Sequence, residues 1–183
     1  MARVQDKVAI VTGGVTGLGF ASALRLADEG AKVTITDVDA ERGPGAAAEI
    51  GRGCRFLAHD VAEEGAWSRV LDTVVGEDGR LDILLNNAGV GIPKNLEETT
   101  LEDWNWIMSV NLAGVFLGTR EGLKAMKAAG GGSIINMSSI EGLIGDRRLA
   151  AYDASKAGVM GWGSGGRRCD GLGPAAEAAG SQA

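Results

Sequence analysis

The sequence is poor in the residues that mark several classes of protein. Its 183 residues include two cysteines, one histidine and one tyrosine. Cys54 and Cys169 form neither a metal-ligand cluster nor a disulfide framework, so we interpret them as reduced thiols and expect no metal site. Eighteen Lys and Arg against 24 Asp and Glu give a net charge of −6, which leaves no basic field for a phosphate backbone. We therefore expect no nucleic-acid partner.

Long apolar runs are also missing. No run approaches the roughly eighteen residues that a membrane-spanning helix needs, so we expect no membrane partner. The early apolar stretch Val8 to Val11 is too short for a signal peptide. The sequence therefore predicts a cytoplasmic protein. Its 45% hydrophobic and 23% charged residues are typical of one globular domain of this length.

What the sequence has is an alternating pattern. Between Lys7 and Ile135, short β-branched runs alternate with longer segments of helical period, which is typical of parallel βαβ units. The expected strands are Lys7 to Thr12, Lys32 to Asp37, Cys54 to Ala58, Asp82 to Asn86 and Ser133 to Met137. The expected helices are Leu18 to Glu29, Ala40 to Ile50, Glu63 to Gly76 and Leu101 to Ala129. Right-handed crossovers predict a doubly wound, three-layer α/β fold with a parallel sheet.

The pattern ends after Ala157. Thirty glycines make the chain rich in this residue, and Gly161, Gly163, Gly165 and Gly166 crowd together shortly after this point. Each glycine inside a helix costs about 1 kcal/mol relative to alanine, so a helix that enters this segment should fray near Gly161. We therefore expect a single domain over residues 1–160 and an irregular, disordered glycine-rich tail over 161–183.

A glycine-rich loop follows the first expected strand. The chain reads Thr12-Gly13-Gly14-Val15-Thr16-Gly17-Leu18-Gly19 and then enters an amphipathic helix. Gly13 and Gly17 would let backbone N–H groups approach a pyrophosphate, and Gly19 would let the helix pack close to the sheet. The G-x3-G-x-G spacing meets the general dinucleotide fingerprint only in part. The alternative is a simple glycine turn between strand and helix.

Asp37 ends the second expected strand, 18 residues after Gly19. A carboxylate there can accept hydrogen bonds from both hydroxyls of an adenine ribose and would repel a 2′-phosphate. No Arg or Lys lies in the glycine loop or immediately beside Asp37, so the sequence favours NAD over NADP. The alternative is that Asp37 only caps the next helix or solvates the end of the strand.

Tyr152 is the only tyrosine, and Lys156 follows it by one helical turn. This spacing places both side chains on one face of a helix. An ammonium beside a phenol favours the phenolate, so Tyr152 could exchange a proton near neutral pH. A Tyr-x-x-x-Lys pair alone is a weak signal, and its surroundings have to strengthen it.

From Lys7 to about Gly158 the sequence resembles the short-chain dehydrogenase/reductase family, whose fold is Rossmann-like. The matching motifs, in chain order, are the loop Thr12 to Gly19, the acidic pair Asp60-Val61, Asn86-Asn87-Ala88-Gly89, Asn111, Ser139, and Tyr152-Asp153-Ala154-Ser155-Lys156. Ser139 stands 13 residues before Tyr152, as the serine of the family does.

The resemblance implies an NAD-dependent oxidoreductase that interconverts a secondary alcohol and a ketone, its small-molecule substrates. Tyr152 would exchange the proton, Ser139 would hold the substrate oxygen, Lys156 would assist Tyr152 and anchor the nicotinamide ribose, and Asn111 would position a water. Asp60 would bind the adenine amino group. The implied cofactor-binding residues are Gly13, Thr16, Gly17, Leu18, Gly19, Asp37, Asp60, Val61, Asn87, Ala88, Gly89, Tyr152 and Lys156.

Several residues have a second interpretation. Ser138 could be the working hydroxyl in place of Ser139, although the spacing favours Ser139. Asn111 could satisfy the backbone of a kinked helix. We expect His59, beside Asp60, to be a solvated residue at the end of a strand and not a base. The segment Ile140 to Asp146 is similar to that of family members that oxidise cyclic or steroid-like alcohols.

The chain departs from the family after the Tyr-Lys pair. Members continue with a longer helix, a sixth strand, substrate-covering helices and a seventh strand, none of which is legible here. We hypothesise that a frameshift between Met160 and Trp162 ended the usual sequence. The fifth strand would then be an exposed edge, and the homo-oligomer of the family need not form. The alternative function is a truncated, catalytically inactive dinucleotide-binding fragment.

Overall fold

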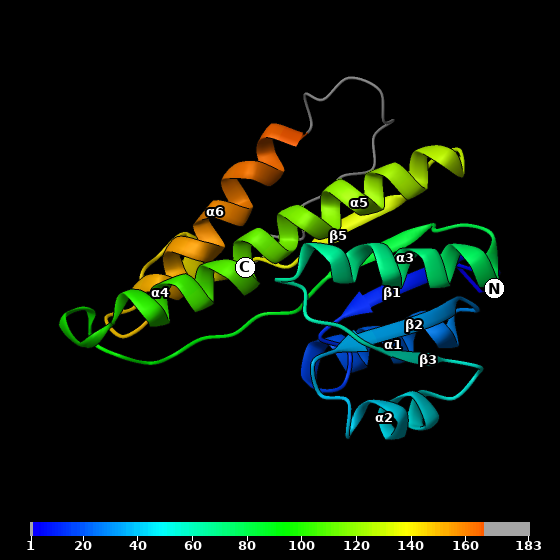
Figure 1. The fold of residues 1–183 in the computed structure, drawn as a ribbon, viewed down its shortest axis with the longest axis horizontal. Helices are drawn as coiled ribbons and strands as arrows, with labels where there is room; N and C mark the ends of the chain where they lie inside the picture. Colours follow the sequence, from blue (N-terminus) through cyan, green and yellow to red (C-terminus); the bar gives the residue numbers. More distant parts are fainter. Residues whose placement is uncertain (1, 167–183) are drawn as a thin grey trace.

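A computed structural model describes residues 2–166 of the chain, with side chains up to residue 161. Five parallel strands form one sheet in the order β3-β2-β1-β4-β5 (Figure 1). The strands are β1 (Val8–Thr12), β2 (Lys32–Asp37), β3 (Arg55–Ala58), β4 (Ile83–Asn86) and β5 (Ser133–Asn136). The order runs outward in both directions from β1, so β1 and β4 enclose the point where the winding reverses. The predicted doubly wound parallel sheet is confirmed.

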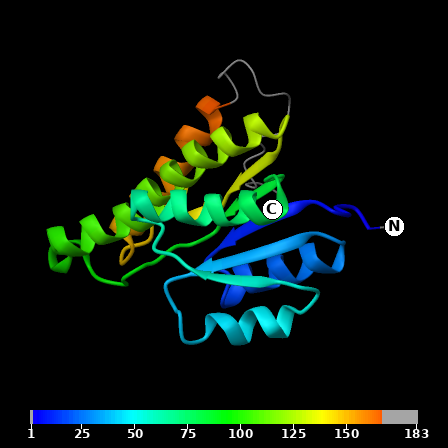
Figure 2. The same cartoon turned by 45° about the vertical axis from the view of Figure 1, so that its right-hand side comes forward.

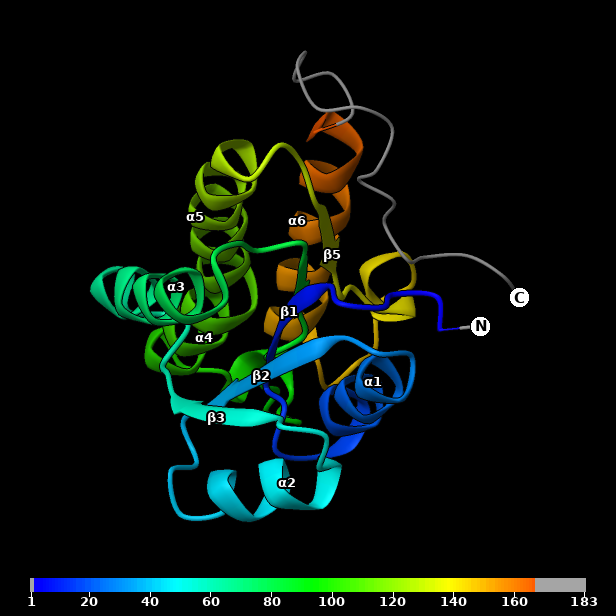
Figure 3. The ribbon, with the colours of Figure 1, turned by 90° about the vertical axis from the view of Figure 1, so that its right-hand side faces the viewer.

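Helices cover both faces of this sheet. The α-helices are α1 (Gly17–Asp28), α2 (Gly43–Ile50), α3 (Glu64–Asp78), α4 (Leu101–Met108), α5 (Gly114–Ala128) and α6 (Ala150–Gly166). Short helical turns are η1 (Leu96–Glu98), the π-turn η2 (Ser109–Ala113) and η3 (Ile140–Gly142). In Figure 3, α1 and α2 lie on one side of the sheet and α3, α4 and α5 lie on the other. Figure 2 shows α2 alongside the edge strand β3, which it contacts.

Two apolar clusters hold the layers together. One lies between the sheet and α1 and α2, and includes Ile35 and Ile50. The other lies between the sheet and α3 and α5, and centres on Trp67. All five residues of β1 are buried, as expected for a strand that is covered on both faces. Each large side chain buried in this way contributes about 1.5–3 kcal/mol.

The long helix expected over Leu101 to Ala129 is interrupted. It begins and ends almost where predicted, but the π-turn Ser109–Ala113 divides it into α4 and α5. Asn111 lies inside this π-turn and is fully buried. Helix α2 also begins three residues later than expected, at Gly43, because Pro44 fixes the first turn of the helix there.

Helix α6 extends beyond the point at which we expected it to fray. It continues through Gly161 to Gly166, so the expected domain boundary at residue 160 falls within a helix. The reason is that a helix already nucleated by packed residues gains one hydrogen bond for each added residue, which offsets the cost of glycine. Ala151 and Val159 supply that packing on the buried side of the helix. The rest of the expected tail, residues 167–183, lies outside the described residues.

Candidate active site

The residues predicted to form the site gather at the carboxyl edge of the sheet. The glycine loop follows β1, Asp37 ends β2, Asp60 follows β3, and Asn87 follows β4. Ser139 follows β5 by three residues. In a doubly wound sheet, the crevice beyond the carboxyl ends of the strands at the reversal point is where ligands bind. Here that crevice lies between β1 and β4.

The glycine loop is shaped for close backbone approach. Gly13 has φ of +63°, and a Cβ on Gly19 would lie 2.0 Å from the Gly13 carbonyl oxygen. Gly17 also has a positive φ, of +58°, with open space where a side chain would project. Thr16 caps α1 without a side-chain hydrogen bond, and Thr16 and Leu18 are exposed. The N–H groups of the first turn of α1 are therefore open to an anion at the positive end of the helix dipole.

Two acidic side chains lie beyond the next strands. Asp37 is half-buried, and its carboxylate accepts hydrogen bonds from the N–H groups of Val15 at 3.3 Å and Asp39 at 3.2 Å. Asp60 is exposed and accepts from the N–H of Ala62 at 2.9 Å. Both carboxylates are therefore oriented by backbone donors while keeping lone pairs for a ligand.

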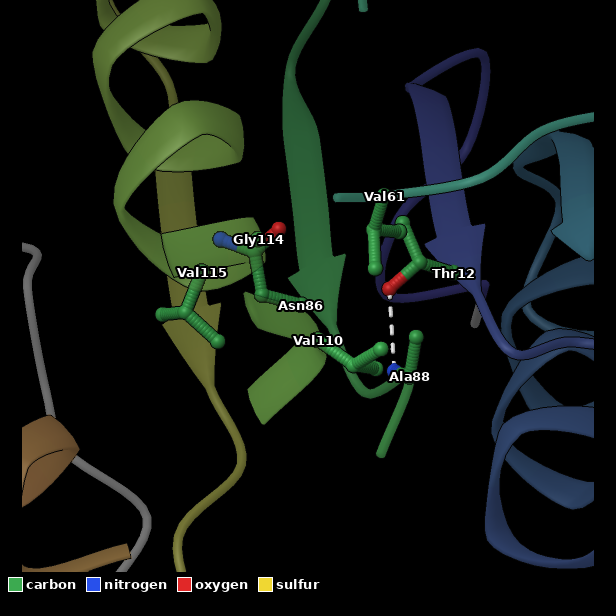
Figure 4. A pocket seen from close by; sticks show the side chains of 7 residues that line it. All are labelled: Thr12, Val61, Asn86, Ala88, Val110, Gly114 and Val115. Carbon is green, nitrogen blue, oxygen red and sulfur yellow. Dashed lines mark hydrogen bonds between the residues drawn. The ribbon is translucent and has the colours of Figure 1, made fainter. Parts of the chain in front are cut away.

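The floor of the crevice is a small apolar hollow (Figure 4). Its empty space, including its open mouth, is about 150 Å³. It is lined by Thr12, Val61, Asn86, Ala88, Val110, Gly114 and Val115. Two of the predicted cofactor residues, Val61 after β3 and Ala88 after β4, therefore line the same hollow. The lining is mainly apolar and holds no charged side chain.

Thr12 joins the glycine loop to the segment after β4. Its hydroxyl oxygen accepts hydrogen bonds from the N–H groups of Asn87 and Ala88, both at 3.0 Å. In return the Asn87 side-chain amide donates to the carbonyls of Thr12 at 2.9 Å and Gly13 at 3.1 Å. This reciprocal pairing fixes the two walls of the crevice relative to each other. Together with the open first turn of α1, it gives a cleft that fits a dinucleotide.

Two of the predicted catalytic side chains, those of Lys156 and Asn111, lie beside Gly89. A Cβ on Gly89 would lie 3.4 Å from the Lys156 Nζ and 3.5 Å from the Asn111 Oδ1. The Lys156 Nζ lies 5.5 Å from the centre of the Tyr152 ring and donates to the Met137 carbonyl at 3.0 Å. Lys156 is only 4% exposed, and burial lowers the pKa of its ammonium. A partly desolvated ammonium therefore lies next to the only tyrosine.

Both polar atoms of the Asn111 side chain bond to protein groups. Its Oδ1 accepts from the Val90 N–H at 2.8 Å, and its Nδ2 donates to the Val90 carbonyl at 2.8 Å. The second Nδ2 hydrogen points to the Ser155 hydroxyl at 3.0 Å, which in turn donates to the Tyr152 carbonyl at 2.6 Å. The side chain therefore satisfies backbone groups, as one of our two interpretations held.

The two adjacent serines differ in their partners. The Ser138 hydroxyl donates to the Lys156 carbonyl at 2.8 Å, which ties β5 to α6. The Ser139 oxygen accepts from the Glu141 N–H at 3.2 Å and so caps the turn η3. A hydroxyl that accepts a cap hydrogen bond keeps its own proton for another acceptor.

Sequence reasoning missed two residues of this network. Ser155 lies inside the Tyr-x-x-x-Lys motif, and its 0% exposure comes from contact with a π-turn 44 positions away. Thr12 was recognised as part of the glycine motif, but its hydroxyl acts on the segment after β4. A polar residue at a position where the helical pattern demands an apolar one was the available signal for Ser155.

His59 is not solvated, contrary to our expectation. It is only 4% exposed, with its ring edge-on to Trp67 at a centroid separation of 4.5 Å. Burial lowers the pKa of His59 from 6.5 to about 4. The difference arises because Trp67, eight residues further along in α3, covers the end of β3, which the sequence pattern does not reveal.

Other site types find little support in the part of the chain that the structure describes. Within residues 2–166, His, Cys, Asp and Glu form no group of three or more that could hold a metal ion. Across the same residues, no helix is both long and apolar enough to span a bilayer. Cys54 is a free thiol, and burial raises its pKa from 9.0 to about 11, so it is unreactive near neutral pH.

Comparison with known proteins decides the family. The model of the short chain dehydrogenase family matches residues 7–168. The chain belongs to the short-chain dehydrogenase family. It is 49% identical over 160 residues to an NADP-dependent (R)-specific alcohol dehydrogenase of Lentilactobacillus kefiri, covering 86% of this chain and 64% of that protein. It is 45% identical over 162 residues to a cyclopentanol dehydrogenase of Comamonas testosteroni, covering 87% and 65%.

The structural comparison agrees with the family assignment. A crystal structure of a short chain dehydrogenase from Mycobacterium smegmatis aligns with a TM-score of 0.84 at 32% identity, over 88% of this chain and 70% of that one. The short-chain dehydrogenase fold is therefore present from β1 to α6. The chain spans less than two thirds of the length of the first two relatives.

Proposed function

We propose that this short-chain dehydrogenase is an NAD-dependent oxidoreductase that interconverts a secondary alcohol and a ketone. The observation that carries the proposal is the meeting of Gly89, Lys156 and Asn111 beside the single tyrosine. The cofactor motif after β4 and the Tyr-Lys pair of α6 thereby share one crevice. Bound NAD would supply the acceptor for the hydride that leaves the alcohol carbon.

Side chains of the protein would transfer the hydroxyl proton of the substrate. Tyr152 would take the hydroxyl proton of the alcohol during oxidation and return it during reduction. The ammonium of Lys156 would favour the phenolate form of Tyr152, because desolvation strengthens the attraction between the two groups. Ser139 would donate a hydrogen bond to the substrate oxygen, and the engagement of Ser138 with α6 supports Ser139 in this role.

Asn111 would act through its backbone. Because both hydrogens of its side-chain amide are donated to protein groups, a water of the proton relay would bind to a main-chain carbonyl of the π-turn. A π-turn interrupts the α-helical hydrogen-bond ladder and is frequent at functional sites. The side chain of Asn111 would then hold the π-turn in place against Val90.

Different residues along the crevice would bind different parts of the dinucleotide. The pyrophosphate would bind to the N–H groups at Gly17, Leu18 and Gly19, the adenine ribose to Asp37, and the adenine to Asp60, Val61 and Ala88. Asp37 supports NAD over NADP, because its carboxylate would repel a 2′-phosphate. Arg42, whose charge interacts with that of Asp37, is paired with Asp39. The relative from L. kefiri is NADP-dependent, so this preference is a property to be measured on this chain.

For the substrate we propose a cyclic or otherwise apolar secondary alcohol. Ile140, Leu143 and Ile144 are exposed on and after η3, the turn that Ser139 caps. Gly91 lies against the Tyr152 ring, and a Cβ on Gly91 would be 3.4 Å from that ring. The names of two relatives, an (R)-specific alcohol dehydrogenase and a cyclopentanol dehydrogenase, support this class.

The test is NADH formation from NAD and cyclopentanol, with Tyr152→Phe as the matched control. Production of NADH that the wild type gives and the phenylalanine variant loses is the expected result. The absence of turnover with cyclic and open-chain secondary alcohols, in protein that binds NADH, would contradict it.

A second candidate function is dinucleotide binding without turnover. It is favoured by the packing of β5, in which Ile134 alone is buried. Binding of NADH together with no oxidation of any alcohol would support this candidate. The division of the chain at residue 160, the cytoplasmic location and the homo-oligomeric state remain predictions from the sequence and the family.

A further inference from the structure

The only histidine of the chain, His59, is buried beside the adenosine end of the crevice and has no part in the proposed chemistry. It follows β3 directly and precedes Asp60. Its backbone N–H donates to the Asp37 carbonyl at 2.9 Å. Its ring Nδ1 lies at hydrogen-bond distance, 3.1 Å, from the Thr36 hydroxyl. His59 therefore binds the end of β2 through both its backbone and its ring.

The His59 ring also contacts Trp67. The two rings are perpendicular, with centroids 4.5 Å apart. The Trp67 indole N–H donates to the Val61 carbonyl at 2.9 Å. One connected set of contacts thus runs from Thr36 through His59 and Trp67 to Val61, which lines the crevice floor.

Core packing alone does not explain an imidazole at this position. The His59 Nε2 is buried and has no hydrogen-bond partner among the described residues. An unpaired polar atom in the core opposes folding, and an apolar ring of similar size would avoid that cost. What an apolar ring cannot provide is the hydrogen bond to Thr36, the residue directly before Asp37.

We propose that His59 is a positioning residue for the adenosine end of a bound dinucleotide. It fixes the separation of Asp37 and Asp60, because it is bonded to the β2 end on one side and continuous with Asp60 on the other. This inference rests on the proposed function, in which Asp37 binds the ribose and Asp60 the adenine. The inference adds His59, which would touch neither the ribose nor the adenine. It also assigns the contact between His59 and Trp67 a role in cofactor affinity.

The experiment uses AMP and nicotinamide mononucleotide as probes for the two ends of the crevice, titrated by calorimetry into the full chain. His59→Phe keeps an aromatic ring but loses the bond to Thr36, and we expect its Kd for AMP to rise about tenfold, the usual effect of one lost hydrogen bond. The Kd for nicotinamide mononucleotide should be unchanged. His59→Asn should restore AMP binding, because its amide can take the place of the imidazole Nδ1.

Two further variants separate positioning from general stability. Val74→Ala removes buried volume from α3, the helix that carries Trp67, and should lower the melting temperature without changing the Kd for AMP. Thr36→Val removes the same hydrogen bond from its other end and should reproduce the His59→Phe effect, which keeps the test valid if His59→Phe does not fold. Because His59 is the only histidine, its imidazole NMR signals should shift on addition of AMP and not of nicotinamide mononucleotide.

The outcomes distinguish the two proposals. Unchanged AMP affinity in both His59→Phe and Thr36→Val would overturn the positioning role while leaving dinucleotide binding intact. A wild-type chain that binds neither AMP nor NADH would overturn the proposed function itself. Equal losses for AMP and nicotinamide mononucleotide would assign His59 to stability alone and would also overturn the positioning role.

Discussion

The two sides of the crevice are built differently. On the nucleotide side, β1 and β4 are buried along their whole length, with α1 on one face of the sheet and α5 on the other. On the catalytic side, β5 lies at the edge of the sheet within residues 2–166, has one buried residue and contacts α5. The difference teaches that the nucleotide side is held by its own core, whereas the catalytic side depends on polar contacts to keep its geometry.

Those polar contacts are concentrated in few residues. Ser138 ties β5 to α6, and Ser155 ties α6 to the π-turn. Helix α6 packs against η3, α4 and η2. A single lost hydrogen bond should therefore disturb the catalytic side more than the nucleotide side, and variants that affect one side alone can test the comparison.

The largest expected effect separates turnover from binding. Tyr152→Phe should reduce kcat by at least about a thousandfold, because it removes the group that exchanges the proton. The Kd for NADH should change by less than about twofold, because a single hydroxyl makes a small part of the dinucleotide contact. Steady-state kinetics and an NADH fluorescence titration measure the two. Residual turnover above one tenth of wild type would contradict the role of Tyr152.

The second prediction disturbs the nucleotide side. Gly19→Ala places a Cβ 2.0 Å from the Gly13 carbonyl oxygen, so α1 must move away from the glycine loop. We expect a loss of about 1–3 kcal/mol in the free energy of unfolding, together with loss of NADH binding. Urea denaturation measures the first quantity.

Gly76→Ala is the matched control for this change. Gly76 lies in α3 with open space where its Cβ would project. The substitution should stabilise the chain by about 0.5–1 kcal/mol, because alanine is the better helix former. If both substitutions have the same effect, the close approach at Gly19 is not what shapes the loop.

The third prediction concerns acid. The pKa of His59 is lowered from 6.5 to about 4 by burial, so the unfolded state binds more protons than the folded state between these values. Stability should therefore fall as the pH drops from 6.5 to 4, by about 3 kcal/mol in total. Urea denaturation across this range measures it, and His59→Asn should lack the slope.

Carboxylates whose pKa is lowered by folding, such as Glu29 and Glu121, lose their contribution only as the pH falls through about 4.5, at the lower end of this window. The pKa of Asp103, for example, is lowered to about 2 by hydrogen bonds from Lys94 and Thr100. Its contribution is lost only below the ordinary range for an aspartate, near pH 3.8. A wild-type chain with constant stability between pH 6.5 and 5 would show that His59 is hydrated in solution.

The smallest expected effect tests the polar link on the catalytic side. Ser155→Ala leaves one N–H of the buried Asn111 amide without an acceptor and should cost about 1–3 kcal/mol of stability. We expect kcat to fall about tenfold with little change in the Kd for NADH, because the π-turn moves relative to Lys156. An equal fall in kcat and in NADH affinity would argue against the claim that the nucleotide side and the catalytic side are held together by different contacts.

The sequence predicted the sheet well because its signals are local. Each strand begins and ends within one residue of its predicted bounds, since β-branched runs are limited by Gly, Asp or Asn at their ends. The glycine loop and the Tyr-Lys spacing are also local patterns, and the structure brings both to one crevice. The division of the long helix was not predictable, because the π-turn depends on Val90 and Ser155, which lie 21 and 44 positions from Asn111.

The burial of single polar residues was also not predicted from the sequence. His59 stands in a polar stretch whose pattern indicates the end of a strand. It is buried because Trp67 of α3 packs against it. The extension of α6 to Gly166 has the same origin, since packing at Val159 outweighs the low helix propensity of glycine. In each case a contact between distant segments overrides what the local pattern indicates.

The most direct test of the account is a fluorescence titration of the full chain with NADH and with NADPH, with Asp37→Ala as the control. The account predicts saturable binding of NADH that is at least about tenfold tighter than that of NADPH, because a carboxylate faces the site of the 2′-phosphate. Asp37→Ala should weaken NADH binding and narrow the difference. Tighter binding of NADPH by the wild-type chain, or no saturable binding of either, would contradict the account.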